Sequence, residues 1–101
     1  MATANVARTS HATLSTTTVD TVNLSDVVRT VNVFNRSGAT DLAVTWACGA
    51  TATTPVQDAA ETLKIPTGVS LTFTVGAAGN SYTTQIKVLG NGNAYSVQGL
   101  G

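Results

Sequence analysis

Apolar and small polar side chains alternate with a two-residue period in segment after segment between Asp20 and Gln98. In Leu42–Cys48 the larger side chains occupy the even positions, and the small or hydroxylated ones occupy the odd positions. The alternation recurs in residues 71–75, 82–88 and 95–97. Because successive side chains of a strand point to opposite faces, this pattern predicts sheets with one buried and one solvent-facing side.

Turn-forming residues separate the alternating segments at intervals of about 8–12 residues. The predicted strands are residues 19–24, 27–34, 42–48, 63–65, 71–75, 82–89 and 94–98. Seven to eight strands without a helix predict an all-β, antiparallel β-sandwich of the jelly-roll- or Ig-like type, although a barrel requires the same alternation. The predicted core consists of Val22, Leu24, Val31, Val33, Leu42, Val44, Trp46, Ile65, Leu71, Phe73, Val75, Ile86, Val88, Tyr95 and Val97.

Residues 1–18 show little periodicity, and Val6 and Leu14 are their only larger apolar residues beyond Met1. We therefore divide the chain into an extended N-terminal arm, residues 1–18, and a β-sandwich domain, residues 19–101. Three structures of the arm stay open: terminal disorder, ordering against a neighbouring subunit, or a short strand of the sandwich. Under the second alternative, we expect removal of residues 1–17 to weaken assembly and leave the domain folded.

Charged residues make up 10% of the chain, against about 25% in typical soluble domains. Threonine contributes about a fifth of the 101 residues, and its β-branched side chain favours strands. Charges normally keep proteins apart and sheet edges unpaired, so a chain this poor in them is suited to an assembly. The net charge of zero provides no electrostatic basis for binding nucleic acid or an anionic membrane.

The chain has neither a segment of roughly 18 apolar residues, as a membrane span requires, nor a basic, then apolar, N-terminal region typical of a secretory signal. We therefore expect synthesis in the cytoplasm. The chain contains one cysteine, which cannot form an internal disulfide and agrees with that compartment.

Catalytic chemistry finds little support in the sequence. The single histidine, His11, lies in the arm, where nothing holds it between a nucleophile and a carboxylate. Cys48 shares a face with Trp46 and is expected to be a small buried hydrophobe without a nearby base. Asp58 and Glu61 have the spacing of one helical turn, but loop carboxylates of this kind are usually solvated. We predict no catalytic residues, no cofactor and no metal site.

Two further features have ordinary structural explanations. The pairs Gly76/Gly79 and Gly90/Gly92 lack a following helix whose amide groups would face a phosphate, so they are expected to form turns. Among the aromatic residues, Trp46, Phe73 and Tyr82 are expected to point inward. Phe34 and Tyr95 remain as weak candidates for stacking on a ligand.

Three segments carry a resemblance to known proteins: residues 31–39 (VNVFNRSGA), 63–75 (LKIPTGVSLTFTV) and 93–99 (NAYSVQG). In their succession of strand-forming and turn-forming residues, these segments resemble small β-sandwich structural proteins of tailed bacteriophage virions, of the capsid decoration (cement) or head-fibre and tail-associated types. The resemblance spans about residues 19–99. It implies a non-enzymatic, repeated and self-assembling part of the particle.

The expected function is therefore that of a capsid decoration protein, located in the virion, whose partners are the major capsid protein or other virion proteins and copies of itself. The candidate assembly contacts are Val6, Arg8, His11, Leu14, Val28 and Phe34. No nucleic acid or membrane partner is expected. A carbohydrate- or surface-binding β-sandwich module, with residues 49–61 as its binding loop, is the alternative, and a generic scaffold or chaperone-like domain also stays open.

Overall fold

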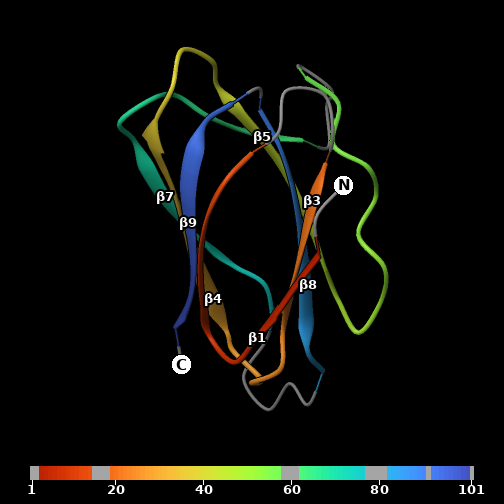
Figure 1. The fold of residues 1–101 in the computed structure, drawn as a ribbon. Helices are drawn as coiled ribbons and strands as arrows, with labels where there is room; N and C mark the ends of the chain where they lie inside the picture. Colours follow the sequence, from red (N-terminus) through yellow and green to blue (C-terminus); the bar gives the residue numbers. More distant parts are fainter. Residues whose placement is uncertain (1–2, 15–18, 58–61, 77–81, 91, 101) are drawn as a thin grey trace.

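The computed structural model describes residues 3–14, 19–57, 62–76, 82–90 and 92–100. In these residues the chain is all-β (Figure 1). The described part of the chain contains no helix that is long and apolar enough to cross a membrane. Its nine strands are β1 (Thr3–Val6), β2 (Thr9–Thr13), β3 (Asp20–Leu24), β4 (Thr30–Ser37), β5 (Leu42–Cys48), β6 (Leu63–Ile65), β7 (Ser70–Thr74), β8 (Thr84–Leu89) and β9 (Ala94–Leu100).

The strands form two sheets that pack face to face, with the orders β1-β3-β8-β5-β6 and β2-β9-β4-β7. When β2–β9 are counted as eight successive strands, the first pairs with the eighth, the second with the seventh, the third with the sixth and the fourth with the fifth. All four of these pairs are antiparallel. This nested pairing is the jelly-roll arrangement. The predicted all-β sandwich is confirmed, and the jelly roll is the type that the strand order selects.

The segment expected to be an extended arm contributes two strands to this sandwich. β1 pairs with β3 in parallel, and β2 pairs with β9 antiparallel. The third alternative for this segment, a strand of the sandwich, is therefore the one observed. The inward positions of β2 are occupied by the small residues Ser10 and Ala12, so the alternation exists but carries almost no hydrophobic contrast by which sequence reasoning can detect it.

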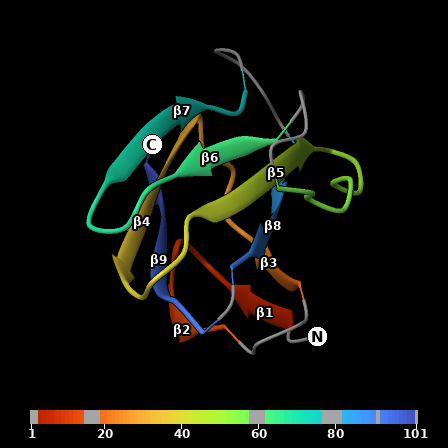
Figure 2. The ribbon, with the colours of Figure 1, turned by 90° about the horizontal axis from the view of Figure 1, so that it is seen from above.

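One chain segment closes each side of the sandwich by passing from one sheet to the other. β1 and β2 lie together on one side, and β6 and β7 lie together on the other (Figure 2). The first corner is held by backbone hydrogen bonds from Ser25 N to Val6 O (2.8 Å) and from Gly99 N to Arg8 O (2.6 Å). On the opposite side of the sandwich, β6 and β7 form the margin of the core.

Most of the predicted core is buried between the sheets, and three of its members lie at the margin. Trp46, Leu71 and Phe73 are partly buried and pack against the core from the β6–β7 side. The rings of Trp46 and Phe73 are in contact, with centroids 4.3 Å apart. Leu71 and Phe73 belong to an edge strand, which has a neighbour on one side only, and this accounts for their incomplete burial. The core also includes Leu14 and Val28, which sequence reasoning did not assign to it. Ala43 and Ala52 are buried as well, but outside this cluster.

The segment around Val28 explains an apparent irregularity in the sequence pattern. The predicted strand 27–34 begins at Thr30, and residues 25–29 form an irregular connection. Val27 points outward and Val28 is fully buried, where its Cγ1 atom would lie 2.8 Å from a methyl group placed on Gly99. Val27 and Val28 therefore belong to the connection before β4, and their opposite directions are not part of the alternation of that strand.

A buried polar network, which we call the asparagine cluster, joins β4 to the β4–β5 and β8–β9 connections. It consists of Asn35, Thr40 and Asn93, and both asparagines are fully buried. Asn93 Nδ2 donates to Asn35 Oδ1 (3.1 Å), and Thr40 Oγ1 donates to Asn93 Oδ1 (3.1 Å). Asn35 Nδ2 in turn donates to the carbonyl groups of Thr40 (3.1 Å) and Ile65 (3.0 Å). These hydrogen bonds provide partners for the buried amide groups of Asn35 and Asn93.

A second polar contact crosses the core between the sheets. Tyr95 of β9 is buried, and its hydroxyl group donates to Asp20 Oδ2 of β3 over 3.1 Å. Burial, together with the neighbouring Asp20 carboxylate, raises the pKa of the Tyr95 hydroxyl above its ordinary value. The expectation that Tyr95 is a candidate for ligand stacking is therefore wrong, whereas its placement in the core is confirmed.

Candidate functional site

The outer face of the four-stranded sheet is a regular surface built from β2, β9, β4 and β7. Because Val31, Val33, Tyr95 and Val97 point into the core, the alternate positions of the same strands point outward. We call this surface the open face. Its side chains belong to Thr9, His11, Thr13, Thr30, Asn32, Phe34, Ser70, Thr72, Thr74, Ala94, Ser96, Gln98 and Leu100.

The strand registers arrange the open face in rows that cross all four strands. One central row runs Thr9–Gln98–Asn32–Thr72, and the next runs His11–Ser96–Phe34–Ser70. His11 Nδ1 and Ser96 Oγ are joined by a hydrogen bond of 2.6 Å, and Asn32 Nδ2 donates to Thr72 Oγ1 over 2.9 Å. The polar side chains are thus partly tied to one another, which limits the rotamer freedom that a partner would have to restrict on binding.

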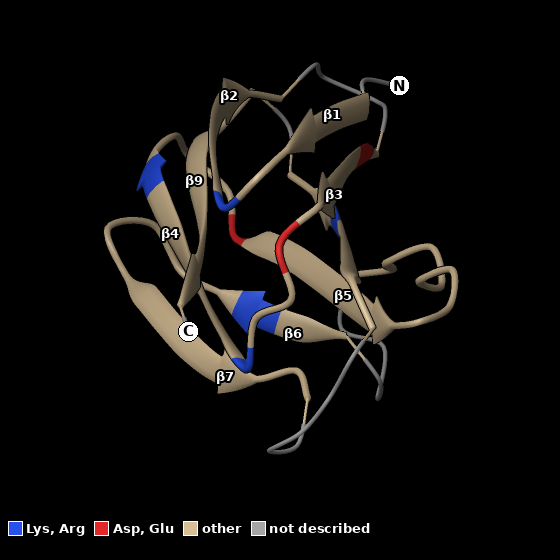
Figure 3. Ribbon diagram, turned by 90° about the horizontal axis from the view of Figure 1, so that it is seen from below, with Lys and Arg blue, Asp and Glu red and all other residues tan. Residues whose placement is uncertain are grey.

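Charge is absent from the open face. Its thirteen positions include no aspartate, glutamate, lysine or arginine, and β2, β9 and β7 carry no charged residue at all (Figure 3). The one charged residue of β4 is Arg36, at the bulge that ends the strand. In the centre of protein interfaces, charged residues are depleted, and the open face shares this lack of charge.

The outer face of the five-stranded sheet is different, because the chain covers part of it. Residues 49–57, which we call the cover loop, place Ala52 and Pro55 in buried positions. Ala52 N donates to Gln85 Oε1 (2.9 Å), and the Thr45 hydroxyl donates to Thr53 O. Gln85 continues the network by donating from Nε2 to Asn23 Oδ1 (2.9 Å). The packing of the cover loop explains why β5 is buried on both faces from Leu42 to Thr45. The sequence pattern predicts one face of this strand to be exposed to solvent.

The six predicted assembly contacts separate into surface residues and core residues. His11 and Phe34 lie in one row of the open face. Val6 and Arg8 lie at the β1–β2 corner, where Arg8 forms an ion pair of 2.9 Å with Asp26. Leu14 and Val28 are 3% and 0% exposed. Both are therefore corrected to core residues, because each turns inward from a connection whose direction sequence alternation does not report.

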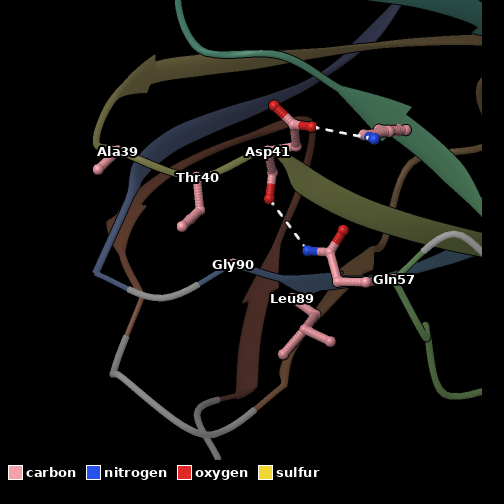
Figure 4. A pocket seen from close by; sticks show the side chains of 7 residues that line it. Ala39, Thr40, Asp41, Gln57, Leu89 and Gly90 are labelled. Carbon is pink, nitrogen blue, oxygen red and sulfur yellow. Dashed lines mark hydrogen bonds and ion pairs between the residues drawn. The ribbon is translucent and has the colours of Figure 1, made fainter.

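A shallow depression of about 510 Å³ lies beside the cover loop. Its lining includes Thr40, Asp41, Gln57 and Lys64 (Figure 4). Asp41 Oδ2 lies 3.3 Å from Lys64 Nζ, and Gln57 Nε2 donates to the Asp41 carbonyl oxygen over 3.1 Å. These contacts engage the polar groups of the depression with each other. Among the described residues that line it, there is no aromatic ring and no nucleophile beside a base.

Chemically reactive residues are dispersed over the described part of the chain. No group of three or more His, Cys, Asp or Glu side chains lies close enough to hold a metal ion in the described ranges. Cys48 is half-buried and not fully buried as expected, and its Sγ lies 3.5 Å from Tyr82 O. Asp58 and Glu61 lie outside the described residues, as do Gly79 and its neighbours in the expected turn.

Tyr82 is the second aromatic residue whose position differs from the prediction. It was expected to point inward as the first residue of a strand, but β8 begins at Thr84 and Tyr82 is 62% exposed. Its side chain lies against Gly49, where an added methyl group would approach the ring to 2.9 Å. Phe34, at 37% exposed, is the aromatic residue that lies on the open face.

Sequence reasoning identified two members of the open face and missed the face as a whole. The sequence signal for this face was the absence of charge at the solvent-facing positions of the alternating segments, which carry uncharged residues such as Asn32, Thr72 and Gln98. Recognising the face required the strand order, since these positions come from four strands that are far apart in the chain.

Comparisons of the chain with protein-family models, with curated proteins and with solved structures found no match.

Proposed function

We propose that this chain is a non-enzymatic structural subunit of a virus particle, a capsid decoration protein that binds the assembled protein shell in many copies through the open face. The single observation that carries this proposal is the contrast between the two outer faces of the sandwich. One is partly covered by the cover loop, and the other is wide, uncharged and bounded by Arg36 at its rim.

An uncharged hydroxyl- and amide-bearing surface suits permanent contact with a protein shell. Burying an unpaired charge costs far more than burying a threonine, whose methyl group gains from leaving water and whose hydroxyl needs only one partner. Phe34 supplies a larger apolar group within this surface. Contacts of moderate strength are sufficient, because subunits that also touch one another on a lattice gain through high effective concentration.

The fold supports the proposal at the level of its class. Jelly rolls occur in viral capsid domains and also in lectins, so the fold alone does not choose between these functions. The resemblance of residues 31–39, 63–75 and 93–99 to virion proteins favours the first.

A specific observation also favours carbohydrate binding as a second candidate. Phe34 shares its row with His11, Ser96 and Ser70, and an apolar ring among hydrogen-bonding groups is a usual element of small-ligand sites. The loop expected to carry such a site, residues 49–61, is described over residues 49–57, where Ala52 and Pro55 are buried. The described lining of the depression beside it includes no aromatic ring. A glycan array with the full chain tests this candidate, and binding that Phe34→Ala abolishes would replace the shell-binding proposal.

Co-sedimentation with particles assembled without this chain tests the proposed function. We expect the purified chain to pellet with them to saturation. Gln98→Glu places a charge in the centre of the open face with almost no change in side-chain volume, and it should reduce binding by more than about ten-fold, or 1.4 kcal/mol. Thr54→Glu, on the exposed part of the cover loop, is the matched control and should bind like the unmodified chain. Equal binding by both variants would refute docking through the open face.

A further inference from the structure

Within the described part of the chain, β7 pairs with β4 on one side and with no strand on the other. The hydrogen bonds from Val75 N to Arg29 O (2.8 Å) and from Asn35 N to Val69 O (3.1 Å) show that odd-numbered residues of this segment face β4. In an antiparallel pair the backbone groups of alternate residues point to opposite sides of the strand. The groups that point away from the sheet therefore belong to Ser70, Thr72 and Thr74.

This edge lacks the features by which natural sheets prevent edge-to-edge pairing. Short strands, charged side chains, prolines and bulges are the usual protections. β6, the edge of the other sheet on the same side of the molecule, is three residues long and carries the exposed Lys64. The five residues of β7 include no charge, proline or glycine, and their pairing with β4 has no irregularity.

The inward side chains of β7 are incompletely buried. Leu71 and Phe73 pack against the margin of the core and are partly buried, as is Trp46, whose ring contacts that of Phe73. A further strand beside β7 would place additional side chains over this margin. The same strand thus presents both unpaired backbone groups and apolar surface.

We propose that two copies of this chain pair through β7, antiparallel, about a two-fold axis at Thr72. In this register Thr72 faces its own copy, Ser70 faces Thr74 of the second copy, and Leu71 faces Phe73 of the second copy. All the residues with outward backbone groups then form hydrogen-bonded pairs, which supply about six hydrogen bonds. A centre at Leu71 or Phe73 would leave one of these pairs unmade.

A second copy is the occupant that the edge itself specifies. The strand is complementary to itself, because its outward face pairs threonine and serine with one another and its inward face pairs leucine with phenylalanine. A two-fold pair is closed, so that no free β7 edge remains to continue the assembly. The pairing joins two four-stranded sheets into a single sheet and also doubles the open face. It does not depend on what that face binds.

Sedimentation velocity of the full chain over a range of micromolar concentrations tests this pairing without any particle. We expect a reversible dimer. Thr72→Lys brings two ammonium groups together at the axis and should raise the dissociation constant of the dimer more than about ten-fold. Gln98→Lys lies in the same row of the open face but two strands away from the axis, and it should leave the dimer intact.

A crosslinking experiment tests the register and remains informative if Thr72→Lys does not fold. In a Cys48→Ser background, Thr72→Cys places two thiols in a directly opposed pair whose Cα atoms lie about 5.5 Å apart, within the range that a disulfide spans. Mild oxidation should yield a covalent dimer. Thr74→Cys is the control, since each introduced thiol would face Ser70 of the second copy and should not crosslink. A monomeric wild-type chain, an oligomer larger than a dimer, or crosslinking of both variants alike would overturn the proposal.

Discussion

Replacing Asn93 by alanine should destabilise the protein although it removes no apolar contact. The Asn93 side chain is fully buried and forms hydrogen bonds with Asn35 Oδ1, with the Thr40 carbonyl oxygen and with the Thr40 hydroxyl group. In Asn93→Ala, Asn35 Oδ1 is left buried without this donor. The Thr40 carbonyl keeps Asn35 Nδ2 and Thr67 Oγ1 as donors, so its loss is smaller.

The magnitude follows from this count. A buried polar atom left without a partner costs about 1–3 kcal/mol, and each lost hydrogen bond contributes about 1 kcal/mol. We therefore expect Asn93→Ala to lower the free energy of unfolding by about 2–4 kcal/mol, out of a typical total of about 5–15 kcal/mol. Asn32→Ala removes one hydrogen bond on the open face and should cost no more than about 1 kcal/mol.

Urea unfolding followed by the fluorescence of the single tryptophan, Trp46, measures both variants. Gly38 provides an internal check, because it has a φ of 143° and a methyl group added to it would lie 1.9 Å from Asn93 Oδ1. Combining Gly38→Ala with Asn93→Ala removes the clash with the side-chain Oδ1 and Cγ atoms and leaves the approach of 2.9 Å to the Cα atom of residue 93. The double variant should therefore lose less stability than the sum of the single variants. A cost below about 1 kcal/mol for Asn93→Ala, or strict additivity, would refute the asparagine cluster.

Three further predictions concern other parts of the sandwich. Burial raises the pKa of Tyr95, so its contribution to stability is fully present below the unfolded-state pKa of about 10 and falls above it, where only the unfolded state releases the proton. Tyr95→Phe should remove this part of the alkaline loss of stability in pH-dependent urea melts. An unchanged dependence of the unfolding free energy on pH in Tyr95→Phe would contradict this prediction. Trp46→Ala should cost about 2–4 kcal/mol, since the side chain is half-buried, and a chemical melt showing less than about 1 kcal/mol would place Trp46 outside the core. Removal of residues 1–13 takes an edge strand from each sheet and should abolish the cooperative thermal transition followed by circular dichroism, whereas a transition like that of the full chain would show that β1 and β2 are dispensable.

The strands predictable from sequence are those in which large and small side chains alternate. β5 and β6 were predicted with their observed bounds, because their inward positions carry leucine, valine and isoleucine. β2 was not, because its inward positions carry serine and alanine, which leave no contrast with the threonines facing outward. Alternation also says nothing about connections, and for this reason the burial of Leu14 and Val28 became evident only from the structure.

The open face and the free edge of β7 were even less predictable from sequence than the strands. His11 and Phe34 are separated by 23 positions in the chain, yet they share a row of the open face because β9 lies between β2 and β4. Neither the neighbourhood of these residues nor the unprotected edge of β7 is encoded in a local motif. Both follow from the jelly-roll order of the strands, which depends on pairings between distant segments.

The copy number of this chain in purified virus particles from its source tests the central claim most directly. Quantitative peptide mass spectrometry gives that number relative to the major shell protein. Our account predicts hundreds of copies per particle, in a fixed ratio to the shell lattice. A handful of copies would move the chain to the neck, tail or fibres and contradict the decoration function, and its absence from the particles would contradict the virion assignment altogether.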